Sequence, residues 1–439
     1  MSIRQDLDKL NKKEAFSLHM PGHKGVRLKT DTTEISLTDN LLHPCGSIKE
    51  LEKSIAHIYD VKKAYIGTNG STGLLMSSLL YAGKGKKVLL PRSSHQSIYK
   101  GIIDQGQEPI YLRNKIDSLG IARPIPAKDY LEHMGKIDTA IFNNPTYEGY
   151  MEDYALLKPF LKDKLSILDG AHGSHLYYIH NQTNNWMSLQ IHSFHKTLGA
   201  MNQGAVMLSN LEDDFREYAN FYQTTSPSFP ILLSIEDSIR EMMTTKVDKR
   251  LSEIDHLKKE ISKIRGFHVI DNDDPLKILL IIDKNISVKV VVEWLEEKRG
   301  VFFELSTDKY LLGILSFYDT QGNYDWFLKS LKMASRNFKM SNDFVCDKDA
   351  YAGVGVEEQY IPTMKLLPGE AFFGEKKAVS IRESKGFVSG VLYSHYPPGA
   401  PLLVPGEIID DYVIENMLNW KGDYTGCDEI KDDIIFVIK

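Results

Sequence analysis

Between residues 64 and 208 the chain alternates short apolar runs with segments of helical periodicity, and this alternation restricts the fold most strongly. Strands separated by helices favour a mostly parallel sheet that is covered on both faces. The expected fold class is therefore α/β, with ligands beyond the carboxyl ends of the strands. The runs predicted to be strands are 64–66, 88–90, 109–112, 139–142, 165–168 and 205–208, with a further one leading into Lys196.

A lysine and an aspartate follow two of these apolar runs. Lys196 lies between two short runs, and Asp169 closes the run 165–168. A desolvated lysine shifts its pKa readily, and its neutral amine can form a Schiff base. An aspartate at a nearby strand end suits pyridoxal phosphate (PLP), because it keeps the pyridine nitrogen protonated. Taken alone, Lys196 is more often a surface lysine, but the pair favours PLP as the cofactor.

Two other strand ends carry residues that suit a binding site. The turn Gly70-Ser71-Thr72 lies between a strand and a helix expected from Leu74, where free backbone N–H groups can meet a phosphate. The turn matches neither a Walker A loop nor GxGxxG, and the alternative is a well-capped helix. His95 follows the next strand, although a lone histidine is more often structural.

Charge and cysteine usage exclude some classes of protein. The net charge of −6 does not favour binding to nucleic acid or to an anionic membrane. The cysteines Cys45, Cys346 and Cys427 are far apart and form no CxxC, which favours a reducing cytoplasm. The N-terminus has no signal-peptide pattern, and no apolar stretch is long enough to span a bilayer. We therefore expect a cytoplasmic protein.

The pattern predicts four parts of the chain. An N-terminal arm (1–45) begins with a helix over 1–16, and a large domain (46–265) ends in one long helix over 234–265. A small α/β domain (266–340) carries strands 277–282 and 311–316 and helices 288–298 and 325–337. Pro and Gly become frequent in a C-terminal α+β domain (341–439) with a closing helix near 415–420. Further helices are expected over 48–59, 127–134, 153–161 and 209–222.

Eight motifs follow one another along nearly the whole chain: HMPGHKG at 19–25, TNGST at 68–72, RSSHQS at 92–97, PTYEG at 145–149, DGAHG at 169–173, SFHKTLGA at 193–200, QTTSPS at 223–228 and YPPGAPLLVPGE at 396–407. In this order they resemble the bacterial Orn/Lys/Arg decarboxylases of PLP fold type I, the aspartate-aminotransferase-like fold. The chain is similar to the short, Gram-positive-type branch, which lacks the N-terminal wing domain.

The resemblance implies a role for each matching residue. Lys196 would be the Schiff-base lysine, Asp169 would pair with the pyridinium, His95 would stack on the ring, and His172 would lie near the ring oxygen. Thr224 or Thr225 would reach the phosphate of a partner subunit, which implies a homodimer with its active site at the interface. The residues implied in holding the phosphate are Gly70, Ser71, Thr72, Ser193 and His195.

Three positions depart from the usual family motifs. Gly170 replaces the glutamate of DEAHG, and we expect it to add backbone freedom. Gln96 replaces a lysine after His95, and Ala400 removes bulk from YPPGIP. These changes do not affect the predicted cofactor, but they leave the identity of the substrate open.

The resemblance implies decarboxylation of a basic amino acid to a polyamine precursor, with arginine as the first choice, then lysine or ornithine. The distal cation needs a carboxylate, for which Glu148, Glu370 and Glu407 are candidates, although each is more often a surface carboxylate. His19 and Lys24 lie on a Pro/Gly-constrained loop and are also candidates for substrate binding. The proton donor to Cα stays open between His172 and Lys196.

Three alternatives remain open. An aminotransferase of the same fold would grip the α-carboxylate with an arginine, and Arg382 is the only arginine beyond 336, which weakens this reading. A decarboxylase-like scaffold could bind a metabolite without catalysis, although all cofactor residues are present. The spacing of Asp169, His172 and His175 permits a metal site, but it leaves Lys196 unexplained, so we expect no metal.

Overall fold

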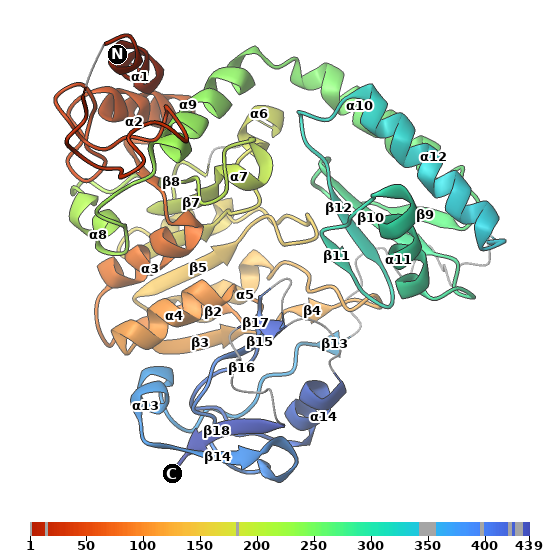
Figure 1. Ribbon diagram of the computed structural model, residues 1–439. Helices are drawn as coiled ribbons and strands as arrows, with labels where there is room; N and C mark the ends of the chain where they lie inside the picture. Colours follow the sequence, from red (N-terminus) through yellow and green to blue (C-terminus); the bar gives the residue numbers. More distant parts are fainter. Residues whose placement is uncertain are drawn as a thin grey trace.

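A seven-stranded sheet forms the centre of the computed structural model, which describes residues 2–13, 16–180, 184–341, 357–395, 399–419, 424–425 and 433–439 (Figure 1). The strand order is β1-β8-β7-β6-β5-β2-β3. The strands are β1 (Lys63–Gly67), β2 (Lys87–Pro91), β3 (Glu108–Leu112), β5 (Thr139–Asn143), β6 (Leu165–Asp169), β7 (Leu189–Ser193) and β8 (Ala205–Ser209). Strands β3, β2, β5, β6 and β7 are parallel, and β8 is antiparallel to both β7 and β1. The mostly parallel sheet predicted from the sequence is confirmed.

Both faces of this sheet are buried, which explains the near-continuous apolar runs of its strands. Alternate residues such as Val88 and Ile141 pack into one core with α3 (Gly70–Ala82) and α4 (Gln96–Gln105). Their neighbours, such as Leu89, pack into a second core. The elements on that second side are α5 (Ala127–Leu131) and the 3-10 helices Met134–Lys136 and Ala155–Phe160. The segment 155–160 contains Pro159, so the α-helix predicted there is a 3-10 helix instead.

The strand register brings the chemically active segments to one edge of the sheet. Asp169 on β6 pairs with Ile191 on β7, and Lys196 follows Ile191 by five residues. Gly67 and Ser193 both pair with Ala205, so the ends of β1 and β7 flank the start of β8. The loops that follow β1, β2, β5, β6 and β7 therefore meet at the carboxyl edge.

Two helices that flank the central sheet, α1 (Ile3–Asn11) and α8 (Arg216–Phe221), are shorter than the sequence suggested, whereas α2 (Ser47–Ile58) has nearly the predicted bounds. Helix α1 ends before residue 16, and its first backbone N–H groups donate to the carboxylate of Glu236 on α9 (Phe229–Thr244). Helix α2 (Ser47–Ile58) follows the arm. The helix predicted over 209–222 is only α8 (Arg216–Phe221).

The long helix predicted over 234–265 is two helices, α9 (Phe229–Thr244) and α10 (Val247–Ile261). The hydroxyls of Thr244 and Thr245 both donate to the carbonyl of Glu241, at 2.9 and 2.8 Å. Such side-chain bonds compete with the helical backbone bonds, and Thr245 takes an extended conformation. The chain bends there toward a second sheet (Figure 1).

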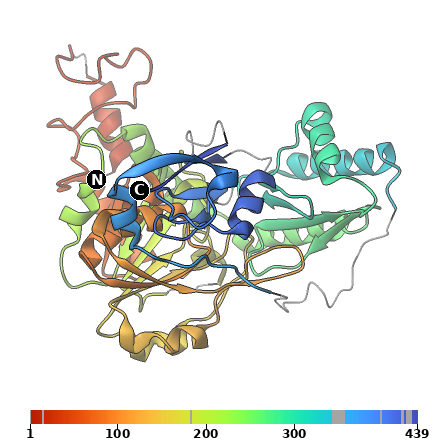
Figure 2. The same cartoon turned by 90° about the horizontal axis from the view of Figure 1, so that it is seen from below.

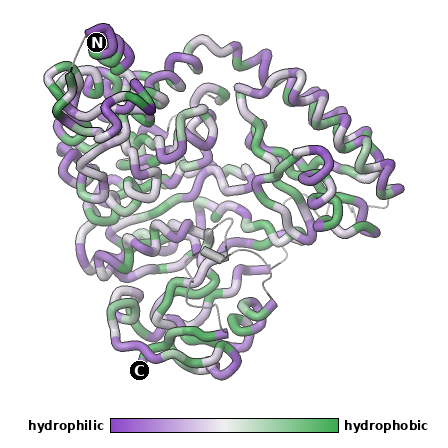
Figure 3. The backbone as a smooth tube through the Cα atoms, viewed as in Figure 1, coloured by the Kyte–Doolittle hydropathy of each residue, from purple (hydrophilic) through white to green (hydrophobic). Residues whose placement is uncertain are grey.

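That second sheet is antiparallel, in the order β11-β12-β10-β9. Helices α10, α11 (Val288–Arg299) and α12 (Gln321–Asn337) pack on one face, and α12 alternates hydrophilic and hydrophobic residues (Figure 3). On the other face Leu279 and Ile281 contact loops of the large sheet. The strands are β9 (Phe267–Ile270), which the sequence analysis missed, β10 (Lys277–Ile282), β11 (Leu305–Ser306) and β12 (Leu311–Ile314).

The C-terminal part packs beside α4, at the bottom of Figure 1, and Figure 2 gives the view from below. Its helices are α13 (Pro368–Phe373), the 3-10 helix Ile381–Glu383 and α14 (Asp411–Asn419), which covers most of the helix predicted near 415–420. Its strand pairs are β13 (Glu357–Glu358) with β4 (Lys115–Ile116), β14 (Lys376–Ser380) with β18 (Ile434–Ile438), and β15 (Tyr393–His395) with β16 (Pro401–Leu403) and β17 (Tyr424–Thr425). Among the described residues no helix is long and apolar enough to cross a bilayer.

A buried ion pair joins the large sheet to the C-terminal part. Arg92, just after β2, is 1% exposed and lies 3.1 Å from the carboxylate of Glu407, which is 0% exposed. Arg92 also donates to the carbonyls of Pro401 and Leu402, and Glu407 accepts from the N–H of Val404. Each charge has its partner only while the two parts remain docked.

Replacing Glu407 by Gln should leave a buried guanidinium without its counter-charge. We expect a loss of about 3–5 kcal/mol in the free energy of unfolding, the usual result of breaking a buried pair. The control is Asp411→Asn, because Asp411 pairs with Lys385 on the surface and should lose less than about 1 kcal/mol. Urea titration of both variants checks this, and equal losses would contradict it.

Candidate active site

Lys196 and Asp169 occupy neighbouring strand ends, as predicted. Lys196 lies in the short helix α7 (Phe194–Thr197), directly after β7, and Asp169 is the last residue of β6. Burial raises the pKa of Asp169, while the nearby Lys196 ammonium opposes that shift. Burial lowers the pKa of Lys196, and Asp169 and then Glu304 oppose it. The pair therefore forms a half-buried site in which the pKa of the carboxyl group is raised and the pKa of the amine is lowered.

His172 connects Lys196 to a second lysine that the sequence analysis missed. Its Nε2 lies 2.9 Å from Nζ of Lys196, and its Nδ1 lies 3.0 Å from Nζ of Lys277. Lys277 is the first residue of β10 and is 0% exposed. Burial, followed by the two lysine charges, holds the pKa of His172 well below its usual range. The small sheet thus contributes a buried amine directly behind the site.

The predicted phosphate turn lies at the start of a helix. Helix α3 begins at Gly70, not at Leu74, so Ser71 and Thr72 form its first turn. Gly70 has a φ of +68°, a conformation that glycine adopts without strain. The hydroxyl of Ser193 donates to that of Ser71 at 2.9 Å. Backbone N–H groups and two serine hydroxyls therefore converge where an anion is favoured.

Two further histidines are placed by the backbone around them. His95 is the N-cap of α4, where its Nδ1 accepts from the N–H of Ser97 at 3.2 Å. Burial, and then the charge of Lys196, lowers the pKa of His95 to about 4. Nδ1–H of His195 donates to the carbonyl of Gly204 at 2.9 Å, and burial lowers its pKa. Both rings are neutral at physiological pH.

Three acidic or phenolic groups near His172 and Lys277 escaped the sequence analysis. Tyr147 donates to Glu304 at 2.7 Å, and its ring lies edge-on to His172 with centroids 5.0 Å apart. Tyr310 donates at 3.1 Å to Glu148, a predicted substrate residue that is buried, and burial raises the pKa of Glu148 to about 7. Glu304 is exposed, so it can meet a ligand, whereas Glu148 faces the buried amine of Lys277.

Other predicted residues lie elsewhere in this chain. The carboxylate of Glu370 caps α13, and Glu407 holds Arg92, so we carry neither into the substrate site. The hydrogen bonds of His19 and Lys24 remain within the N-terminal arm. Arg382, the candidate of the aminotransferase reading, is exposed in the C-terminal part.

The loop 223–228 lies beside the phosphate turn of its own chain. The Gln223 side chain accepts from the N–H of Thr68 at 3.1 Å. Thr224 bonds with Ser226, and Thr225 is exposed. Their predicted contact with a partner subunit stays a prediction.

The alternative metal site is not assembled. His172 faces two lysines, and Nε2 of His175 lies 2.8 Å from Asp274, where both side chains are 0% exposed. Within the described ranges no group of three His, Cys, Asp or Glu side chains is arranged to hold a metal ion.

Residues 10–279 match the family model for the major domain of the Orn/Lys/Arg decarboxylases. The chain belongs to this family. An arginine decarboxylase of Bacillus anthracis is 26% identical, and the match covers 93% of this chain and 91% of the relative. The constitutive lysine decarboxylase of E. coli superposes with a TM-score of 0.82 at 20% identity, covering 100% of this chain and 82% of that structure. Serine palmitoyltransferase (SPT) with PLP gives a TM-score of 0.56 at 17% identity over 77% and 84%.

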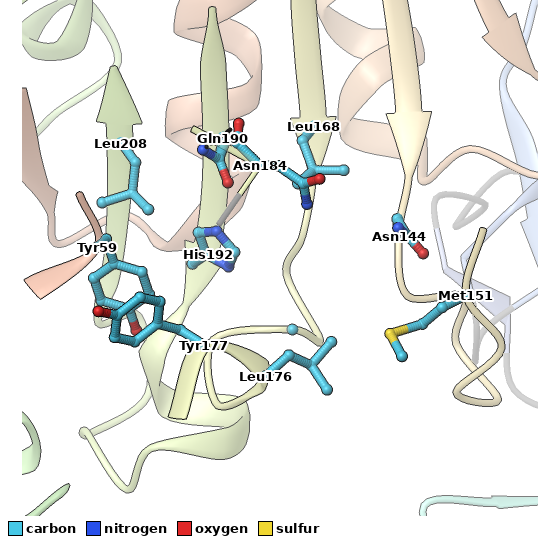
Figure 4. A pocket seen from close by; sticks show the side chains of 11 residues that line it. Tyr59, Asn144, Met151, Leu168, Leu176, Tyr177, Asn184, Gln190, His192 and Leu208 are labelled. Atoms are coloured by element: carbon cyan, nitrogen blue, oxygen red, sulfur yellow. Dashed lines mark hydrogen bonds between the residues drawn. The ribbon is translucent and has the colours of Figure 1, made fainter. Parts of the chain in front are cut away.

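This member of the family departs from the DEAHG motif at Gly170. The structure explains this glycine by a different cause from the one we expected. The φ of Gly170 is not positive, so backbone freedom does not explain it. A Cβ at this position would lie 2.8 Å from Cε1 of His192 on β7. His192 lines a small cavity of about 30 Å³ with Tyr59 and Tyr177, enough room for a water molecule (Figure 4). The glycine makes space for the histidine ring.

Any side chain at 170 should therefore overpack this cavity wall. We expect Gly170→Ala to lower the free energy of unfolding by about 1–3 kcal/mol. The substitution should cost less in a His192→Ala background, because the clashing ring is gone. Thermal unfolding of the two single variants, the double variant and the parent measures this coupling, and strictly additive losses would count against it.

Proposed function

We propose that this chain is a PLP-dependent decarboxylase of a basic amino acid, with arginine as the first choice, then lysine or ornithine. The juxtaposition of Lys196 and Asp169 at adjacent strand ends, in front of the start of α3 with its Ser71 and Thr72 hydroxyls, carries the proposal. The arginine preference rests on the arginine decarboxylase relative, which is 26% identical over most of the chain.

The residues fit the chemistry of PLP group by group. The start of α3, with Ser71, Thr72 and Ser193, offers N–H and hydroxyl groups to a phosphate. Asp169 is a half-buried carboxylate whose described acceptor bond uses only one N–H, that of Ala171, so it can also face a pyridinium N–H. When bound, PLP would supply an electron sink for the bond that breaks at Cα.

Each protein group then has a defined task. Lys196 would hold the cofactor covalently and release it to the substrate. Asp169 would keep a positive charge on the ring nitrogen, and His95, neutral with a pKa of about 4, would lie over the ring without repelling that charge. His172 would lie near the ring oxygen and is placed to move a proton to or from Lys196 at 2.9 Å.

Glu304 is the carboxylate we propose for the substrate's distal cation. It is exposed, accepts a hydrogen bond from Tyr147 at 2.7 Å, and is close enough to raise the pKa of Lys196. A guanidinium pairs well with a fixed carboxylate, and its bidentate geometry favours arginine over lysine.

We further propose a cytoplasmic homodimer with the active site at the subunit interface and Thr224 or Thr225 directed to the partner's cofactor phosphate. The division into an arm (1–45), a PLP-binding domain (46–265), a small domain (266–340) and a C-terminal domain (341–439) belongs to the same proposal. The reducing compartment is supported by the sparse cysteines.

Release of CO2 from carboxyl-labelled amino acids tests the function. With added PLP the protein should release CO2 from arginine faster than from lysine or ornithine, and Lys196→Ala should lower the rate by at least about a thousandfold. Lys100→Ala, on exposed α4 surface, is the matched control. Pyruvate-dependent amino transfer without CO2 would overturn the decarboxylase assignment.

Removing the charge of Glu304 tests the substrate pocket separately. Glu304→Gln keeps the size of the side chain and an acceptor for Tyr147, but it removes the counter-charge of a guanidinium. We expect KM for arginine to rise about tenfold or more while kcat changes less, because a charge-assisted hydrogen bond is lost in binding. An unchanged KM would place the distal cation elsewhere.

A further inference from the structure

The imidazole of His172 lies between two amines at hydrogen-bond distance, 2.9 Å from Lys196 and 3.0 Å from Lys277. A neutral imidazole has one donor nitrogen and one acceptor nitrogen, whereas an ammonium only donates. Two ammonium groups cannot both donate to one neutral ring. A cationic ring is disfavoured, because burial and both lysines lower the pKa of His172. One of the two amines is therefore neutral when both hydrogen bonds form.

Lys277 is the amine of the pair that gives up its proton more readily. Its side chain is 0% exposed, and its neighbour Asp274 already binds His175 at 2.8 Å. Lys196 lies half-buried beside Asp169, so its charge costs less. Burial lowers the pKa of Lys277 to about 8, so the amine is partly neutral near pH 7.5 and mostly neutral above pH 8. When Lys277 is neutral, Nδ1–H of His172 donates to Lys277, and Nε2 accepts from the Lys196 ammonium.

Lys277 nevertheless lies among groups that can stabilise a proton. The carboxylates of Asp274, Glu304 and Glu148 all raise its pKa, while the charge of Lys196 lowers it. The ring of Tyr147 faces it, with Nζ 5.6 Å from the centroid. Once Lys196 loses its proton, the repulsion from that charge disappears. The buried amine therefore becomes a better base at the moment a proton arrives.

We propose that Lys277 stores the proton that Lys196 must give up before its amine can react, with His172 as the carrier. The N–H bond of Lys196 breaks as Nε2–H of His172 forms, and Nδ1–H of His172 breaks as an N–H bond of Lys277 forms. The total charge stays at +1, and the ring ends in the opposite tautomer. Lys277 acts through His172 and is a positioning residue, not a group that touches the substrate.

This inference rests on the proposed function in one respect, which is that the proposed chemistry requires a neutral Lys196 amine. Its test uses the full-length apoprotein with neither PLP nor substrate, so the two can fail separately. Trace labelling with acetic anhydride across pH, followed by mass spectrometry, reports the neutral fraction of Lys196. The labelling is normalised to its limit at high pH, which removes differences in access.

Two variants remove the store in different ways. Lys277→Met has no proton acceptor, and Lys277→Gln keeps a carbonyl for Nδ1–H of His172 but cannot take a proton. In both we expect the pH midpoint of Lys196 labelling to rise by about one unit, or about tenfold less labelling at pH 7.5. Wild-type labelling in Lys277→Gln would reduce Lys277 to a hydrogen-bond partner and overturn the store.

The matched control is Lys258→Met on α10. Lys258 is also partly buried and also lies near Asp274, which raises its pKa against the effect of burial. It makes no described hydrogen bond to His172, so the Lys196 midpoint should not move. A shift as large as that of the Lys277 variants would show a general charge effect and contradict the relay.

A measurement on the unmodified protein covers the case in which the Lys277 variants fail to fold. Nitrogen-15 NMR of histidine-labelled apoprotein, assigned with His172→Asn, distinguishes the two tautomers of His172. We expect a protonated Nδ1 and an unprotonated Nε2 at pH 8.5, above the pKa of about 8 of Lys277. A protonated Nε2 would place the neutral amine on Lys196 and refute the store.

Discussion

The common direction of β1, β2, β5, β6 and β7 is the constraint on which the rest of the structure depends. Each of these strands ends at the same edge of the central sheet, so the loops after them share one small space. The register brings together three segments that are more than twenty residues apart in sequence: Asp169, Lys196 and the start of α3. The apolar strand interiors provide the stability that holds polar groups at this edge.

Burial then adjusts the chemistry of those polar groups. The same desolvation that raises the pKa of Asp169 lowers the pKa of Lys196, His172 and Lys277. Neighbouring charges only partly offset this effect. The small sheet takes part because β10 directs Lys277 to the same side as Leu279 and Ile281, toward the large sheet. The packing between the two sheets therefore also determines where protons are held at the site.

Much of this site could be predicted from local pattern. Lys196, Asp169, His95 and the turn 70–72 each follow an apolar strand, and the strand signal is strong where both faces are buried. Lys277 could not be found in this way, because it is simply the first residue of a strand until the small sheet is docked. Glu304 was hidden for the same reason, since its place depends on Tyr147 in a loop of the large sheet.

Other misjudgements have equally physical causes. The long helix divides at Thr245 because threonine hydroxyls compete for the Glu241 carbonyl, an effect that helical periodicity does not register. Gly170 was read as a flexible residue, whereas the ring of His192 from the neighbouring strand determines it. The sequence makes Glu370 and Glu407 candidates for the substrate's distal cation, but a helix N-terminus and a buried arginine already use them.

The proposed active site depends most on Lys196 being the residue that holds PLP. Borohydride reduction of the protein with PLP, followed by peptide mapping, measures this directly. We predict that one mole of reduced cofactor per chain is fixed to Lys196, with little on Lys277, which is fully buried at rest. Attachment mainly to Lys277 or to surface lysines, or no fixed cofactor at all, would contradict the assignment of the strand-end site.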